Sequence, residues 1–257
     1  MPLRLAMWSG PRNVSTALMR AFDSRSDCFV SDEPLYGYYL SKHGLPHPIA
    51  EQIMASMATD WQSITHHLTG PIPHGRQLWY QKHMSHHLLD EIPRDWLCQL
   101  TNVFLVREPR AMLASLLQVL PEVDIADTGL PQQVELFRWE MERTGRVPVV
   151  VDSRELLLNP GGVLKQLCER VGITYGDEML SWEAGVRPTD GCWAPYWYGD
   201  THNSTGFTPY QPKEVEVPAD YESLAQQCET LYQELAAFRL LANADGTVVE
   251  SISHPQA

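Results

Sequence analysis

The chain has 257 residues, of which 44 % are hydrophobic, and a formal net charge of −13 at pH 7. A chain of this length and apolar content can bury one large core, so we expect a single domain over residues 1–257. Only 19 Lys and Arg residues stand against 32 Asp and Glu residues, which argues against the basic surfaces that bind nucleic acids. Nucleic acid is therefore not an expected partner.

The cysteines and the N-terminus indicate a cellular compartment. The five cysteines are widely spaced, and an odd number leaves at least one thiol unpaired in any disulfide scheme. The N-terminus runs directly into a strand-like segment without a basic region followed by an apolar stretch, and no run of about 20 apolar residues occurs. These features predict a cytoplasmic protein with no membrane partner.

Short apolar segments with the character of buried strands recur along the chain, at 3–8, 28–31, 77–81, 102–106 and 147–151. Each is followed by helical periodicity or a capping signal. Strands that alternate with helices predict an α/β fold, with a central parallel sheet flanked by helices on both faces. We expect residues 34–75 to form a helical insertion and residues 245–257 to form a flexible tail.

Helix signals are clear in the second half of the chain. Asp152 and Asn159 are predicted N-caps, and Gly172 is the predicted end of the second of these helices. Near the C-terminus, apolar residues mark one face of a helix that starts near Asp220, at positions Leu224, Cys228, Leu231, Leu235 and Phe238. This face either packs into the core or forms the contact of a homodimer.

The loop after the first strand is rich in groups that bind anions. It reads Gly10-Pro11-Arg12-Asn13-Val14-Ser15-Thr16 and leads into a helical segment. Unpaired N–H groups at a helix N-terminus, the helix dipole and the side chains of Arg12, Ser15 and Thr16 all favour phosphate or sulfate oxygens. The loop lacks the Gly-x4-Gly-Lys-Ser/Thr pattern of nucleotide-triphosphate loops. The sequence thus predicts a ligand that carries phosphate or sulfate.

A second motif follows the fourth predicted strand. The apolar run Val103–Val106 is followed by Arg107-Glu108-Pro109-Arg110 and a helical segment that places Ser115 eight residues after Arg107. An Arg-x-Pro phrase with a serine at this spacing is distinctive.

Together the two motifs resemble the sulfotransferase family, which has a P-loop-like α/β domain and uses the donor PAPS (3′-phosphoadenosine 5′-phosphosulfate). The first loop is similar to the family's 5′-phosphosulfate loop, and Arg107 to Ser115 is similar to its 3′-phosphate clamp. Three further phrases resemble a bacterial sulfotransferase-like subgroup: Asp32-Glu33-Pro34-Leu35-Tyr36, Tyr80-Gln81-Lys82-His83-Met84 and Asn203-Ser204-Thr205-Gly206-Phe207. The resemblance implies transfer of a sulfuryl group from PAPS to a hydroxyl or amine of a small molecule. It also implies that the helical insertion over residues 34–75 helps to form the acceptor pocket.

The resemblance also implies a set of donor-binding residues. In the family a late loop contacts the 3′-phosphate, and the matching residues here are Ser204, Thr205 and Gly206. The complete set is Pro11, Arg12, Asn13, Val14, Ser15, Thr16, Arg107, Ser115, Ser204, Thr205 and Gly206. Asn13-Val14 replaces the family's Ser-Gly, and a β-branched valine disfavours positive φ. Asn13 is therefore the residue expected to adopt any left-handed conformation in this loop.

Sulfuryl transfer needs a base for the acceptor, cations at the sulfuryl oxygens and rigid positioning. Glu33 follows the second strand, at the sheet edge where ligands bind, and by resemblance it is the first candidate for the base. Asp32 is an alternative, but neighbouring strand positions point to opposite faces, so both carboxylates are not expected at one acceptor. Lys82 or Arg12 would stabilise the transferring group, and His83 is an alternative base.

No metal is expected. His83, His86 and His87 have a spacing that places three histidines on one helix face, but the His-Glu-x-x-His pattern is absent. Two other functions stay open: an ATP-dependent phosphotransferase of the P-loop type, and a catalytically idle protein that binds PAP (the desulfated product of PAPS) or another nucleotide.

Overall fold

The computed structural model describes residues 2–43, 49–120, 122–212 and 215–241. Five strands form one parallel sheet in the order β2-β3-β1-β4-β5. They are β1 (Leu3–Ser9), β2 (Cys28–Asp32), β3 (Leu78–Met84), β4 (Thr101–Val106) and β5 (Val149–Asp152). The predicted α/β class with a central parallel sheet is confirmed. β3 continues past its predicted end, so Lys82 and His83 are part of the strand.

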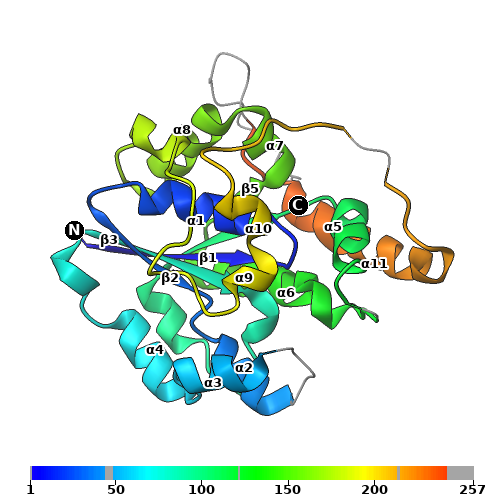
Figure 1. The fold of residues 1–257 in the computed structure, drawn as a ribbon, viewed down its shortest axis with the longest axis horizontal. Coiled ribbons are helices and arrows are strands. Elements are labelled where there is room, and N and C mark those ends of the chain that lie inside the picture. The colour runs from blue at the N-terminus through cyan, green and yellow to red at the C-terminus, as the bar shows by residue number, and fades with distance from the viewer. Residues whose placement is uncertain (1, 44–48, 121, 213–214, 242–257) are drawn as a thin grey trace.

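The sheet is covered on both faces because its strands are apolar at successive positions. Leu5 and Met7 pack with α1 (Ser15–Asp23) and α8 (Pro160–Val171). Ala6 and Trp8 point to the other face and pack with α4 (Trp61–Thr69), α6 (Leu130–Thr144) and α11 (Glu222–Ala236). Figure 1 shows α1 and α8 above the sheet and α4 below it. Because successive side chains of a strand point to opposite faces, each strand contributes to two hydrophobic cores, one on each face of the sheet.

The remaining elements connect these layers. The other α-helices are α2 (Tyr36–His43), α3 (Ala50–Ser56), α5 (Pro109–Leu116), α7 (Ser153–Leu158), α9 (Ala194–Trp197) and α10 (Gly199–His202). Short 3-10 helices cover Pro73–Gly75, Ser85–His87, Asp95–Gln99, Ala126–Thr128, Asp177–Leu180 and Ala219–Tyr221. α2, α3 and α4 lie within residues 34–75. The segment 245–257, predicted to be a tail, lies outside the described residues.

The predicted caps of α7 and α8 are confirmed. The Asp152 carboxylate accepts hydrogen bonds from the N–H groups of Arg154 and Glu155, and Asn159 accepts one from Gly162. Gly172 ends α8 with a φ of 78°, which is the left-handed conformation that glycine adopts at low cost.

Helix α11 packs on α5 and α6. Its residues Ala225 and Cys228 are buried against Met112 and Leu113 of α5. The interpretation of this helix as a core element is therefore confirmed, although Phe238, beyond its end, stays 39 % exposed. A homodimer stays a prediction.

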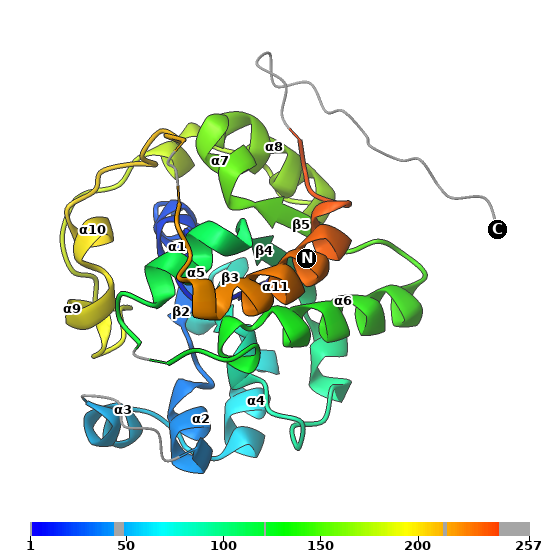
Figure 2. The ribbon, with the colours of Figure 1, turned by 90° about the vertical axis from the view of Figure 1, so that its right-hand side faces the viewer.

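The strand order creates a divergence at the carboxyl edge of the sheet. From β1 the chain crosses to β2 on one side, and from β4 it continues to β5 on the other side. Ligands of open α/β sheets bind where neighbouring strands diverge in this way. Figure 2 faces this side of the molecule, with α5 near the centre and α9 and α10 to one side.

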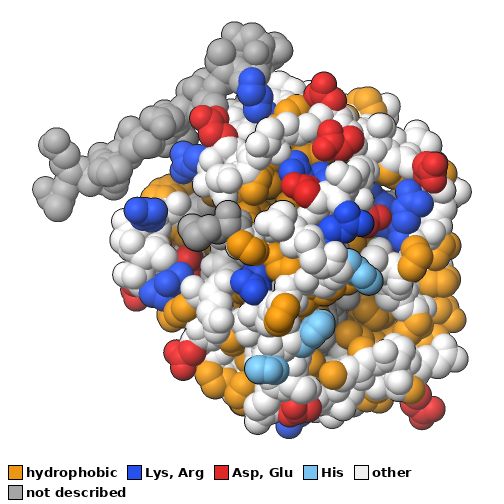
Figure 3. Space-filling model, turned by 90° about the vertical axis from the view of Figure 1, so that its left-hand side faces the viewer, with side chains coloured by type: hydrophobic (Ala, Val, Ile, Leu, Met, Phe, Trp, Pro, Cys, Tyr) orange, Lys and Arg blue, Asp and Glu red, His pale blue; other side chains and the backbone are white. Residues whose placement is uncertain are grey.

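Other global features agree with the composition. Within the described ranges no helix is long and apolar enough to cross a bilayer. All five cysteines are free. The face opposite to the one in Figure 2 carries basic side chains interspersed with acidic ones (Figure 3).

Candidate active site

The loop between β1 and α1 turns through a left-handed residue. That residue is Arg12, with a φ of 53°, and not Asn13 as the sequence predicted. Val14 has a φ of −82° and stands directly before the first residue of α1, a conformation that a β-branched side chain tolerates. A valine is therefore accommodated where the family has Gly, because the positive φ of this loop lies at Arg12 and not at Val14.

Asn13 instead anchors the loop. Its Nδ2 donates to the carbonyl of Leu105 at 3.1 Å, and its Oδ1 accepts from the N–H of Val14 at 2.8 Å and from the hydroxyl of Ser153. The side chain thus connects β4, α1 and α7. A residue with both a donor and an acceptor is required for this role.

Gly10 approaches another backbone closely. A Cβ atom at this position would lie 2.4 Å from the carbonyl oxygen of Thr128. We therefore expect Gly10→Ala to lower the free energy of unfolding by about 1–3 kcal/mol, because both backbones must move apart. Gly199→Ala is the control, since a Cβ added there would meet no atom within 4 Å beyond its own chain neighbours. Equal urea midpoints for the two variants would contradict this prediction.

Two arginines converge beside the loop. The Nε of Arg12 donates to the hydroxyl of Ser115 at 2.9 Å, and Arg107 donates to the carbonyl of Arg12. Within the described part of the chain, neither guanidinium forms a salt bridge with a carboxylate. Burial and the charge of Arg12 lower the pKa of Arg107. Two adjacent unpaired cations at a helix N-terminus form a site for an anion.

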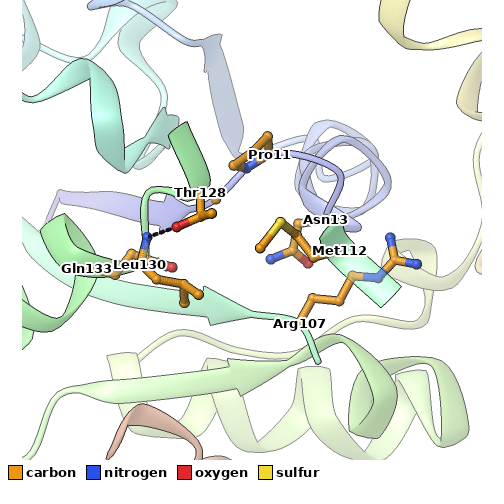
Figure 4. Close-up of a pocket in the computed structure, with 8 residues that line it drawn as sticks. Pro11, Asn13, Arg107, Met112, Thr128, Leu130 and Gln133 are labelled. Carbon is orange, nitrogen blue, oxygen red and sulfur yellow. Dashed lines mark hydrogen bonds between the residues drawn. The ribbon is translucent and has the colours of Figure 1, made fainter. Parts of the chain in front are cut away.

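A small pocket lies at the point where the chain diverges from β1 and β4. In Figure 4, Thr128, Leu130 and Gln133 line one side, while Asn13, Met112 and Arg107 line the other and Pro11 lies above. The pocket is therefore built from the β1–α1 loop, the residue that follows β4, Met112 of α5, the end of the 3-10 helix Ala126–Thr128 and the start of α6. The sequence motif that contains Arg107 did not indicate the contribution of α6.

A buried polar cluster lies at the ends of β2 and β3. The Nζ atom of Lys82 lies 2.8 Å from Oδ1 of Asp32, 2.6 Å from Oε1 of Glu33 and 2.6 Å from the hydroxyl of Tyr198. These three acceptors use all three protons of the ammonium group. The Lys82 side chain is 1 % exposed, so the cluster is shielded from water.

Both carboxylates reach Lys82, and this contradicts the expectation that they point to opposite faces. The strand β2 ends at Asp32, and Glu33 has a φ of 46°. The left-handed residue interrupts the strand alternation, so its side chain turns to the same side as that of Asp32. A non-glycine residue in this conformation is costly, and such strain concentrates at functional sites.

The charges in this cluster do not balance, because one lysine faces two carboxylates. Burial raises the pKa of Glu33, and the negative charge of Asp32 adds to this effect against the attraction of Lys82. For Lys82, burial lowers the pKa, but the two carboxylates outweigh burial and raise it overall. Lys82 therefore keeps its proton, and Glu33 is a carboxyl group with a raised proton affinity.

Sequence reasoning missed the residues that close this cluster. Tyr198 donates to Asp32 at 2.8–2.9 Å and accepts from Nε1 of Trp193 at 3.1 Å, and the N–H of Gly191 donates to Asp32 at 3.2 Å. The segment that carries them is fixed to α1 by a buried salt bridge of 2.7 Å between Arg20 and Asp190. The sequence offers one signal, the aromatic run Trp193-Ala194-Pro195-Tyr196-Trp197-Tyr198, but nothing near it in the chain connects it to Glu33.

His83 points to the face opposite Lys82. Its ring stacks on Trp8 at 4.3 Å, and its Nε2 lies 3.3 Å from Oε1 of Gln81. The residue is 1 % exposed, and burial lowers its pKa to about 3. In this position a neutral imidazole contributes to the core.

The lowered pKa of His83 predicts an acid-sensitive stability. Below pH 6.5, the ordinary pKa of histidine, His83 binds a proton in the unfolded chain but not in the folded protein. The free energy of unfolding therefore falls as the pH decreases from 6.5 toward 3. We expect His83→Phe, which keeps a ring on Trp8, to reduce the stability loss between pH 6 and pH 5 by roughly 1 kcal/mol. Urea unfolding at both pH values measures this. His66→Phe, at an exposed position on α4, is the control, and an unchanged slope in His83→Phe would refute the prediction.

Two further histidines lie between Glu33 and the β1–α1 loop. The Nδ1 of His87 lies 3.9 Å from Oε2 of Glu33. The rings of His86 and His87 are 4.4 Å apart, and a Cβ on Gly129 would lie 3.6 Å from Nδ1 of His86 and 3.4 Å from the Cα of Gly10. The described residues contain no group of three His, Cys, Asp or Glu side chains that could hold a metal ion.

Ser204, Thr205 and Gly206 are not brought to the loop. The hydroxyl of Ser204 accepts a hydrogen bond from Nε1 of Trp182, and the carbonyl of Thr205 accepts one from the backbone N–H of Trp182. Gly206 forms an antiparallel β-bridge with Ser181. The carbonyl of Ser181 in turn accepts from Ser24, which follows the C-terminal end of α1. The β1–α1 loop lies at the other end of that helix. A donor-binding role for these residues stays a prediction without a supporting contact.

The fold and the site together define an α/β protein with two adjacent arginines at the carboxyl edge of a parallel sheet, next to a buried carboxylate. A family model described as "Sulfotransferase domain" matches residues 3–237. The chain belongs to this family, and the resemblance read from the two motifs is confirmed.

Relatives and solved structures add to this result. The chain is 33 % identical over 227 residues to branched-chain-amino-acid aminotransferase-like protein 2 of Arabidopsis thaliana, and 31 % identical over 228 residues to protein 1 of that name. The match covers 88 % of this chain but only 40 % of each relative, so their names describe much longer proteins. A sulfotransferase from Alicyclobacillus acidocaldarius shares the fold, with a TM-score of 0.53, 13 % identity, and coverage of 91 % of this chain and 96 % of that chain.

Proposed function

We propose that the protein transfers a sulfuryl group from PAPS to a small-molecule acceptor. The observation that carries this proposal is the pair Arg12 and Arg107, which meet at the N-terminus of α1 without a carboxylate partner among the described residues. In a chain with a net charge of −13, two guanidiniums side by side without a carboxylate favour an anion. A donor with a phosphosulfate and a 3′-phosphate supplies more than one.

The donor would be held by both motifs. Arg12, the hydroxyls of Ser15 and Thr16, and the free N–H groups of the helix N-terminus would bind the 5′-phosphosulfate. Arg107 and Ser115 would bind the 3′-phosphate. Ser115 already accepts a hydrogen bond from Arg12. A movement of the donor at the 5′-phosphosulfate would therefore displace a residue that binds the 3′-phosphate, and the reverse.

Glu33 would act as the base. The acceptor atom forms a bond to sulfur while the bond from sulfur to the bridging oxygen of the phosphosulfate breaks. The electron pair of that bond leaves with PAP, and the acceptor proton moves to the Glu33 carboxylate. The raised pKa of Glu33 brings its proton affinity closer to neutral pH, which favours general base catalysis.

Lys82 would orient Glu33 rather than bind the donor. Its three protons are directed to Asp32, Glu33 and Tyr198. Arg12, which lies in the loop itself, is then the better-placed cation for the transferring group. This division assigns positioning to Lys82 and electrostatic stabilisation to Arg12.

Calorimetry with PAP and with ATP plus Mg²⁺ tests the donor. Tight binding of PAP and weaker, magnesium-independent binding of ATP are expected, whereas a preference for ATP with Mg²⁺ would favour a phosphotransferase. Incubation with ³⁵S-labelled PAPS and a panel of alcohols and amines then tests transfer. The label should reach an acceptor with the native protein and not with Glu33→Gln, which should still bind PAP. PAP binding without transfer to any acceptor would indicate an idle binding protein.

A further inference from the structure

The strands β1 and β4 diverge just before the two arginine motifs begin. The last residues that pair between them are Ser9 and Leu105. Arg12 is the third residue after β1, and Arg107 is the first residue after β4. The backbone ladder therefore fixes neither arginine. Apart from the hydrogen bond from Arg107 to the carbonyl of Arg12, the contacts that hold these two strand ends come from side chains elsewhere in the fold.

Gln133, in the first turn of α6, bridges the two strand ends. Its Nε2 donates to the carbonyl of Trp8 at 2.9 Å and to the carbonyl of Leu105 at 3.1 Å. The amide group has two protons, so both hydrogen bonds form at the same time. Gln133 is 1 % exposed and lies across the pocket from Asn13 (Figure 4). It therefore holds the end of β1 at a defined distance from the end of β4.

Further hydrogen bonds connect this bridge to both motifs. The Leu105 carbonyl also accepts from Nδ2 of Asn13 at 3.1 Å, and Asn13 directly follows the arginine of the first motif. The hydroxyl of Ser153 bonds to Oδ1 of Asn13 and lies 2.8 Å from the carbonyl of Val106, which directly precedes the arginine of the second motif. Each arginine is thus the chain neighbour of a residue in one hydrogen-bond network, with Gln133 at one end and Ser153 at the other.

The network acts against a repulsion between the two guanidiniums. Burial, and after it the charge of Arg12, lower the pKa of Arg107, so the two like charges oppose each other at this edge of the sheet. A neutral amide can join two carbonyls without adding a charge beside them. A carboxylate in the same place would have no proton to donate, which explains why glutamine and not glutamate suits position 133.

We infer that Gln133 and Ser153 are positioning residues that together set the spacing of Arg12 and Arg107. This inference rests on the proposed function, in which the two arginines bind phosphates at the 5′ and 3′ positions of one ribose. Such a ligand is favoured only when the two cations lie at the matching separation. A nucleotide with a 5′-phosphate alone needs only the β1–α1 loop, so its affinity should depend little on this spacing.

PAP and adenosine 5′-monophosphate (AMP) test the inference, because they differ only in the 3′-phosphate. Gln133→Met keeps a side chain of similar length but cannot donate a hydrogen bond. We expect it to lower the preference for PAP over AMP about tenfold, mainly through weaker PAP binding. Isothermal titration calorimetry measures both affinities. Their ratio in one sample does not depend on how much of the variant is folded, so a purely structural role of Gln133 would leave it unchanged.

A second variant and a matched control use the same two ligands. Ser153→Ala removes a single hydroxyl from the other end of the network and should also lower the ratio, by roughly threefold. Gln166→Met is the control, since Gln166 is 2 % exposed and donates to the carbonyl of Leu241 at 2.9 Å, outside this network. It should keep the native ratio. An unchanged ratio in Gln133→Met or in Ser153→Ala would overturn the inference.

Hydrogen exchange without any ligand tests the positioning directly. The backbone amides of residues 8–16 and 104–110 should exchange faster in Gln133→Met than in the native protein and in Gln166→Met. Equal exchange in all three proteins would overturn the inference.

Failure of the inference and failure of the proposed function give different results. If the native protein binds PAP no better than AMP, the proposed function is wrong, and the inferred role in donor binding falls with it. If the native protein prefers PAP but Gln133→Met keeps the same ratio, the proposed function stands and the inference alone is refuted.

Discussion

Lys82→Met should lower the free energy of unfolding by about 3–5 kcal/mol at neutral pH. Methionine is close to lysine in length but removes the only cation that touches Asp32 and Glu33 in the described structure. Two carboxylates would then remain buried within reach of each other. Urea unfolding followed by circular dichroism measures the change.

The pH dependence of this variant separates a charge effect from a packing effect. Without Lys82, the folded state raises the carboxylate pKa values, so stability is present at low pH and is lost as the pH rises. The deficit of Lys82→Met should therefore shrink between pH 7 and pH 5. Asp32→Asn added to Lys82→Met should restore part of the stability, because one buried charge is removed. Lys165→Met, at an exposed position on α8, is the matched control. A deficit independent of pH would show that lost packing, and not unpaired charge, destabilises the variant.

Arg107→Ala should weaken PAP binding about 10- to 100-fold, the loss expected for one or two charged hydrogen bonds. Adenosine 5′-phosphosulfate, which lacks the 3′-phosphate, should lose much less affinity. Arg12→Ala should instead weaken both ligands, because Arg12 belongs to the loop that would hold the 5′ group. Isothermal titration calorimetry of each variant with each of the two ligands measures these changes in affinity.

Controls for this prediction come from the same chain. Arg138→Ala removes a surface arginine whose partner is Glu234 and should leave both affinities unchanged. Equal losses for both ligands in Arg107→Ala would refute its assignment to the 3′-phosphate. Since Arg107 also donates to the carbonyl of Arg12, the melting temperature of the variant should be recorded alongside.

The two largest predicted effects share one physical origin. Each concerns like charges brought together at the carboxyl edge of the sheet: two carboxylates around Lys82, and two guanidiniums beside the β1–α1 loop. The first group is neutralised in part by a lysine from the chain. The second group has no carboxylate partner in the described residues, and we propose that the phosphate and sulfate groups of the donor supply the negative charge.

Much of the fold follows from local patterns. Short apolar runs mark buried strands, and Asp152, Asn159 and Gly172 mark helix ends, because these signals act over a few residues. The same is true of the donor motifs. The free N–H groups and the dipole of a helix N-terminus favour anions, and these are local features, so Arg12 and Arg107 could be singled out before their positions were known.

The arrangement of the site was decided by the tertiary structure. That Arg12 and not Asn13 adopts the left-handed conformation depends on Asn13 bonding to Leu105 and Ser153, which lie far along the chain. That Asp32 and Glu33 meet at Lys82 depends on a positive φ at Glu33. These contacts follow from the strand order and not from any nearby residue.

The sequence by itself therefore determined the class of fold, and it singled out the two loops that we propose to bind the donor. The tertiary structure alone decided that Tyr198 closes the cluster around Glu33 and that Oε2 of Glu33 faces His87. Tyr198 is 165 residues from Glu33 along the chain. Local propensities act over a few residues, whereas a buried polar cluster forms only after distant segments have packed and lost their water.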